Sequence, residues 1–140
     1  MSKPAVHGAR RAKLFDASSL VGLKYGCTEY AVKRLTGRDL LEETGLPPKK
    51  IGFENIEALT GGQCAVKKGT DADFLAGKLN GAMLRIHPTG QKYLHTVVVI
   101  DGRRENPVIE DQVSRRAVPA GILLAEWESA GQRYARCTVI

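Results

Sequence analysis

The stretch His95-Thr96-Val97-Val98-Val99-Ile100-Asp101-Gly102 decides how the chain folds, because it predicts a buried strand followed by a turn. The β-branched run from Val97 to Ile100 is typical of a strand that is covered on both faces. Asp101-Gly102 is a turn signal, and the chain returns over Val108–Val113. We therefore expect a strand over Tyr93–Ile100 that pairs antiparallel with the returning segment.

Further strands are expected in the C-terminal half. Ala82–Ile86 precedes the central stretch, and Gly121–Trp127 and Tyr134–Ile140 are expected to form a last hairpin around the turn residues Ser129–Gln132. Together these segments predict an antiparallel sheet.

Helical spacing dominates the N-terminal half. From Cys27 to Leu41 apolar residues recur every three or four positions, and Gly37 either ends this helix or marks a short break. Two shorter helices are expected over Ile51–Leu59 and over Thr70–Leu79, the latter opening on capping residues. N-terminal helices packed on a C-terminal antiparallel sheet make an α+β fold.

The length and composition fit one globular domain. The chain has 140 residues, of which 43% are hydrophobic and 26% charged, and these values allow a packed core. Residues 1–13 are polar and basic, so we expect a flexible arm followed by a single domain over 14–140. The net charge of +6 is spread over scattered basic pairs without a nucleic-acid motif. We expect a solvated basic surface rather than a nucleic-acid partner.

Neither a membrane nor a metal is expected. The basic arm has no apolar core of a signal peptide, and no stretch approaches the roughly 18 apolar residues of a membrane span. The three cysteines, Cys27, Cys64 and Cys137, form no close pair, which argues against a disulfide framework and a zinc site. A reduced compartment, no metal and no cofactor are the expectation.

Cys27 is the candidate nucleophile because it stands where an amphipathic helix begins, directly after Gly26. The unpaired N–H groups and the dipole of a helix N-terminus favour a thiolate over a thiol. The same N–H groups can stabilise an oxyanion that forms on a substrate carbonyl. The general base is expected to be His95, at the mouth of the central strand, because His7 lies in the arm and His87 precedes a proline at a turn.

A third polar residue should orient the imidazole of His95, and the loop after the central strand decides which one it is. If Asp101-Gly102 forms a tight two-residue hairpin, Asn106 and Glu110 share the face of His95.

If the loop is longer, Asp111 lies on that face. Pro107 cannot donate to a sheet ladder and favours the longer loop. Asp111 is therefore the expected third member, with Asn106 and Glu110 as alternatives. Gln112 is a further candidate, either for orienting the other side chains or for stabilising an oxyanion.

A Cys that opens a helix, followed by the block from His95 to Gly102 and then by Val108–Gln112, resembles a known family. Over residues 20–115 the chain looks like the papain-fold toxin domains of bacterial polymorphic toxin systems, and it is also similar to CHAP-type amidohydrolases. It differs from papain itself in having no Gln a few residues before Cys27. Backbone N–H groups are therefore the expected oxyanion donors.

The resemblance implies a papain-like catalytic domain with a triad of Cys27, His95 and Asp111. Members of these groups are cysteine hydrolases that cleave peptide or isopeptide bonds, deamidate glutamine or cut peptidoglycan amides. It also implies a bacterial effector or toxin that is made in the cytoplasm and exported by a dedicated secretion system. A protein or peptide-like substrate and an acidic immunity protein would be its partners.

Two other functions stay open. The first is a basic nuclease that uses His87 or His95 together with Arg85 or Lys92. The second is a non-catalytic binding module in which Cys27 and His95 are core residues.

Overall fold

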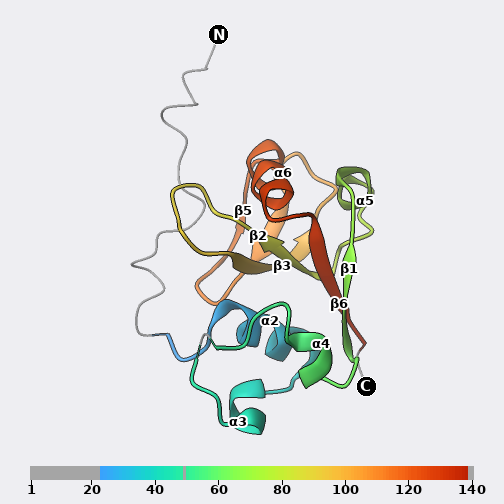
Figure 1. The fold of residues 1–140 in the computed structure, drawn as a ribbon. Helices are drawn as coiled ribbons and strands as arrows, with labels where there is room; N and C mark the ends of the chain where they lie inside the picture. The colour runs from blue at the N-terminus through green and yellow to red at the C-terminus, as the bar shows by residue number, and fades with distance from the viewer. Residues whose placement is uncertain (1–22, 49, 139–140) are drawn as a thin grey trace.

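The expected α+β fold is confirmed in the computed structural model, which describes residues 23–48 and 50–138 (Figure 1). The predicted arm over 1–13 lies outside the described residues. N-terminal helices pack against a six-stranded antiparallel sheet with the order β1-β6-β2-β3-β4-β5. The strands are β1 (Cys64–Lys68), β2 (Met83–Ile86), β3 (His95–Asp101), β4 (Val108–Glu110), β5 (Arg115–Ala117) and β6 (Arg133–Cys137). The helices are α2 (Cys27–Thr36), α3 (Leu40–Thr44), α4 (Ile56–Leu59), α5 (Asp71–Leu75) and α6 (Ala120–Ser129).

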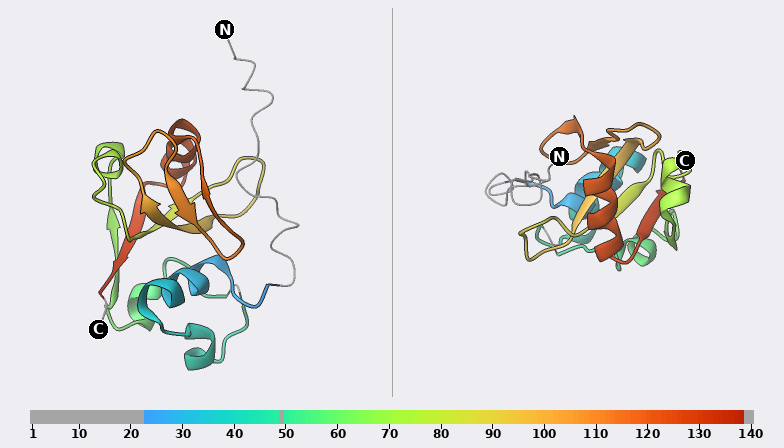
Figure 2. Two further views of the ribbon diagram at one scale, coloured as in Figure 1. Left: turned by 180° about the vertical axis from the view of Figure 1, so that it is seen from behind. Right: turned by 90° about the horizontal axis from the view of Figure 1, so that it is seen from above.

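The central strand β3 is covered on both faces, as its valine run predicts. Helices α2, α3 and α4 lie on one side of the sheet, and α5 and α6 lie on the other (Figures 1 and 2). Val98 belongs to the core beside α2, while Val97 and Val99 belong to the core beside α6, which also contains Trp127. Alternate side chains of one strand thus hold two helical layers together.

Helix α2 begins at Cys27, as predicted, and ends at Gly37, whose φ of 81° lies in the left-handed region that favours glycine. The two later helices are shorter than expected. Only Ile56–Leu59 of the segment 51–59 is helical, and the helix that Thr70 caps ends at Leu75.

The prediction of a strand over Gly121–Trp127 is wrong, because this segment lies inside helix α6. Its short apolar run fits both periods, and the Leu, Ala and Glu residues between Pro119 and Ser129 favour a helix. Leu123 and Trp127, four positions apart, are both buried on one face of α6. The strand expected over Tyr134–Ile140 is β6, which pairs with β1 and β2 instead of with 121–127.

The expectation that the cysteines form no disulfide is also wrong. Cys64 of β1 and Cys137 of β6 are directly paired in the ladder, with 4.1 Å between their Cα atoms, and they form a disulfide. The pairing could not be predicted from local sequence, because 73 residues separate the two cysteines. Cys27 is the free cysteine that remains. None of the helices in the described residues is long and apolar enough to span a membrane.

We expect the Cys64–Cys137 disulfide to stabilise the fold by about 2–4 kcal/mol, because it closes a long loop in the unfolded chain. Urea unfolding of the oxidised and dithiothreitol-reduced protein measures this difference. Intact mass spectrometry after iodoacetamide treatment should find one modified cysteine without reductant and three after reduction and unfolding. Three modified cysteines without reductant would contradict the disulfide.

Candidate active site

The sulfur of Cys27 lies at the first residue of α2. The N-cap residue is Gly26, which has no side chain to accept from the first N–H groups of the helix. Instead, the carboxylate of Glu29 turns back and accepts a hydrogen bond of 3.1 Å from the Gly26 N–H. The first helical N–H groups are therefore left without a side-chain cap, and they favour negative charge on the sulfur or on a nearby oxygen.

His95 opens β3 and is 1% exposed. Its Nε2 lies 3.1 Å from Oδ2 of Asp111, and the imidazole also interacts electrostatically with the Cys27 thiol. Because Nε2 is engaged by Asp111, Nδ1 is the nitrogen on the side of the sulfur. Tyr93 stands edge-on to the ring, with 6.2 Å between the ring centroids, and restricts its rotation. The structure thus brings Cys27, His95 and Asp111 into one line of contacts.

The longer loop after β3 places Asp111 beside His95, as the argument from Pro107 predicts. The register pairs Val98 with Glu110 at the end of β4, so Asp111 leaves the strand level with position 97. Oδ1 of Asp111 accepts hydrogen bonds of 2.9 Å from the N–H groups of Val113 and Ser114. These bonds fix the carboxylate while its other oxygen faces His95.

The two alternatives for the third member do not contact His95. Asn106 is exposed in the loop between β3 and β4. Glu110 accepts hydrogen bonds from Tyr30, Arg34 and Arg115, and it connects α2 with β4 and β5. Glu110, the last residue of β4, therefore supports the scaffold, while Asp111, the residue after the strand, faces the imidazole.

A threonine pair that the sequence did not indicate fixes the two halves of the site. Thr28 and Thr96 follow Cys27 and His95 in the chain, and their hydroxyl oxygens lie 3.0 Å apart in a buried contact. The Thr28 hydroxyl is also 3.9 Å from the sulfur. The pair therefore sets the position of the helix start relative to the strand start.

The electrostatics of the site favour a thiolate and an imidazolium. Burial raises the pKa of the Cys27 thiol, but the hydrogen bond and charge of His95, with contacts from Thr96 and Thr28, lower it from 9.0 to about 7. Burial lowers the pKa of His95, but its hydrogen bonds to Asp111 and Cys27 raise it above the ordinary value of 6.5. Burial also raises the pKa of Asp111, and the hydrogen bonds from His95 and the backbone lower it below 3.8. Each charge in the line stabilises the next.

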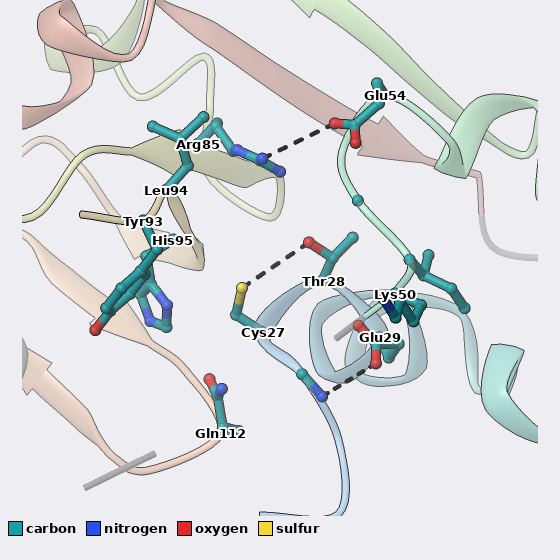
Figure 3. A pocket seen from close by; sticks show the side chains of 13 residues that line it. Cys27, Thr28, Glu29, Lys50, Glu54, Arg85, Tyr93, Leu94, His95 and Gln112 are labelled. Atoms are coloured by element: carbon teal, nitrogen blue, oxygen red, sulfur yellow. Dashed lines mark hydrogen bonds and ion pairs between the residues drawn. The ribbon is translucent and has the colours of Figure 1, made fainter. Parts of the chain in front are cut away.

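A cavity of about 500 Å³ opens directly over the sulfur, and we call it the cleft. It is lined by residues 26–29 at the start of α2, residues 50–52, Glu54, Arg85, residues 93–95 and Gln112. Figure 3 shows the sulfur of Cys27 and the ring of His95 on facing walls, with the side chain of Gln112 beside them. The Oε1 atom of Gln112 is buried and, within the described residues, has no hydrogen-bond partner. A carboxamide in this position is free to bind a substrate.

The residues of the nuclease hypothesis are not assembled as a set. His87 Nε2 contacts the backbone oxygen of Gln91 at 2.9 Å, and Lys92 does not line the cleft. Arg85 shares the cleft with His95. Within residues 23–48 and 50–138, no group of three or more His, Cys, Asp or Glu could hold a metal ion.

The chain matches no protein-family model, no curated protein and no solved structure.

The reaction of Cys27 with iodoacetamide should rise with pH through a midpoint near 7, because only the thiolate reacts. In His95→Gln the hydrogen bond and charge are lost while burial remains, so the midpoint should move to 9 or above. Since a thiol of pKa about 9 is only roughly 1% ionised at pH 7, the reaction there should slow by roughly 50-fold. An unchanged pH profile in His95→Gln would show that the imidazole does not act on the sulfur.

Substitutions of the neighbours Glu110 and Asp111 should affect different properties, the first the stability of the fold and the second the reactivity of Cys27. Glu110→Gln should lower the free energy of unfolding by about 1–3 kcal/mol, because three donors lose a charged acceptor. It should leave the pH midpoint of Cys27 alkylation in place. Asp111→Asn should raise that midpoint, because the imidazolium loses its anionic partner. Urea unfolding and alkylation rates of both variants measure the two effects, and a shifted midpoint in Glu110→Gln would contradict this division.

Proposed function

We propose that the protein is a cysteine-dependent amide hydrolase with a papain-like catalytic domain, acting as a peptidase or a glutamine deamidase. The observation that carries the proposal is the buried line from Asp111 through His95 to Cys27, which ends at a free thiol of lowered pKa in an open cleft. A nucleophile, its base and an orienting carboxylate are the three parts that acyl transfer through a thiolate requires.

In this mechanism the Cys27 thiolate attacks the carbonyl carbon of an amide and forms a C–S bond. The C–N bond then breaks, and the imidazolium of His95 gives its proton to the leaving nitrogen, which departs as an amine or, in a deamidation, as ammonia. A water molecule next transfers a proton to the imidazole and attacks the thioester. The C–S bond breaks, and the carboxylic acid leaves while the thiolate and imidazolium are restored. Asp111 holds the imidazole in the required tautomer throughout.

The developing oxyanion has two sources of donors within the cleft. The uncapped N–H groups at the start of α2 lie beside the sulfur and replace the upstream Gln that the sequence lacks. The carboxamide of Gln112 lies on the opposite side of the sulfur, and its Nε2 carries the N–H groups that can donate to the oxyanion. Donors from both sides would hold the carbonyl between them.

We further propose that this hydrolase is a bacterial effector or toxin exported by a dedicated secretion system. Its net charge of +6 suits an acidic immunity protein, because opposite charges speed association. The Cys64–Cys137 disulfide fits a chain that meets an oxidising environment, such as the periplasm or the outside of the cell.

Substitution of Cys27 should abolish hydrolysis. The wild-type protein, Cys27→Ala and the matched control Cys64→Ala/Cys137→Ala are incubated with a peptide mixture from a bacterial proteome. Mass spectrometry scores cleaved bonds and Gln-to-Glu conversion. We expect Cys27→Ala to lose activity by about 10³-fold or more, and the control to keep it. Full activity in Cys27→Ala would refute the hydrolase, and RNA or DNA breakdown that resists iodoacetamide would favour the nuclease.

A further inference from the structure

Arg85 presents a guanidinium in the wall of the cleft. It lies on β2 with a side chain that is 16% exposed, and its guanidinium carbon stands 5.6 Å from the ring centroid of Phe53. Stacking on the aromatic ring holds the planar group in one orientation. Figure 3 shows the guanidinium reaching across the wall above the sulfur of Cys27.

The donors of this guanidinium are almost unused. An arginine has five N–H donors in a fixed fork, yet no residue of the described chain accepts a hydrogen bond from Arg85. Its ion pair with Glu54 is long, at 3.9 Å, and the Glu54 side chain is 67% exposed. Such an exposed pair is weak and exchanges readily with solvent or with another anion. A mostly buried cation is thereby left available to a stronger, bidentate acceptor.

The position of Arg85 relates it directly to the reacting group. Arg85 is the cross-strand partner of Thr96, whose hydroxyl contacts that of Thr28, the residue after Cys27. Directly paired residues have Cβ atoms about 5 Å apart. Arg85 and Cys27 also line the same cleft, so the guanidinium is within reach of a part of the substrate that neighbours the attacked carbonyl.

We propose that Arg85 binds a carboxylate of the substrate, carried on a residue next to the scissile amide, and that Glu54 occupies this site when the cleft is empty. This inference rests on the proposed function and adds the substrate class, a peptide with a carboxylate beside the bond that is cut. The carboxylate is either a side chain of Asp or Glu or the end of the chain. Arg85 is then a specificity-determining residue that sets which amide reaches Cys27.

Gly52 supports the role of Glu54 as a placeholder. The Glu54 carboxylate lies so close to the Gly52 Cα that a Cβ there would collide with it. The φ of Gly52 is outside the left-handed region, so alanine fits its backbone. Gly52→Ala should therefore push the Glu54 carboxylate aside without changing the charge of the cleft.

The test compares two alkylating agents of equal shape, iodoacetate and iodoacetamide. In both reactions the Cys27 sulfur bonds to the CH₂ carbon and iodide leaves, but only iodoacetate carries a carboxylate. A change in the reactivity of the Cys27 thiolate affects both rates equally, so the ratio of the iodoacetate rate to the iodoacetamide rate reports only on the carboxylate. In Arg85→Gln the iodoacetate to iodoacetamide ratio should fall by about fivefold or more, because the carboxylate loses its ion pair. The matched control Arg103→Gln removes an exposed cation beyond the end of β3 and should not change it.

The placeholder is tested with the same ratio. Glu54→Gln removes the competing carboxylate and Gly52→Ala displaces it, so both variants should raise the ratio, by about twofold or more. An equal ratio in the wild type and Arg85→Gln would overturn the inference. An unreactive Cys27 in the wild type would instead refute the proposed function, so the two failures are distinguishable.

Protection of Cys27 from iodoacetamide distinguishes the two sources of the carboxylate. Acetyl-Gly-Gly with a free chain end and acetyl-Asp-amide are compared with acetyl-Gly-Gly-amide and acetyl-Asn-amide, each at millimolar concentration. Protection by the first alone assigns a chain end, and protection by the second alone assigns a side chain. Protection by both shows that Arg85 binds either kind of carboxylate. Protection by neither, or by inorganic phosphate only, would overturn the proposal.

Discussion

The contact between the start of α2 and the start of β3 is the constraint on which the site depends. The buried hydroxyl pair of Thr28 and Thr96 connects residues that are 68 positions apart in the chain. Because Cys27 and His95 each precede one of these threonines, fixing the pair also fixes the distance between sulfur and imidazole. A buried hydroxyl without a partner costs free energy, so this contact is maintained for reasons of stability as well as of placement.

The second constraint is the length of the loop between β3 and β4. A tight hairpin would have turned Asn106 and Glu110 toward the imidazole, whereas the observed register brings Asp111 there. Glu110 then faces α2, where it binds Tyr30 and Arg34. The two adjacent carboxylates thus have different roles. Glu110 holds helix α2 to the sheet, and Asp111 stabilises the positive charge of the His95 imidazole.

The sequence was sufficient for features that depend on local pattern. The valine run of β3, the helix at Cys27 and the effect of Pro107 on the loop all follow from residue types at short spacing. It was insufficient where long-range contacts decide. The segment of β1 is short and ends in two lysines, so only its pairing with β6 makes it a strand. The same pairing brings Cys64 to Cys137, and the apolar segment of α6 became a helix although its run fits both periods.

The candidate site is built from distant parts of the chain, and this links its chemistry to folding. The nucleophile comes from the first described helix, while the base and its carboxylate come from the sheet. In the unfolded chain Cys27 loses His95, and its pKa returns toward 9.0, so the thiolate exists at neutral pH mainly in the folded protein. The lowered pKa means that the ionised thiol stabilises the fold once the pH exceeds 9.0, and that this contribution disappears as the pH falls through about 7. Near neutral pH the fold makes Cys27 reactive, but the ionised thiol adds little to the free energy of unfolding. The stability of the protein therefore comes from the two cores and the disulfide.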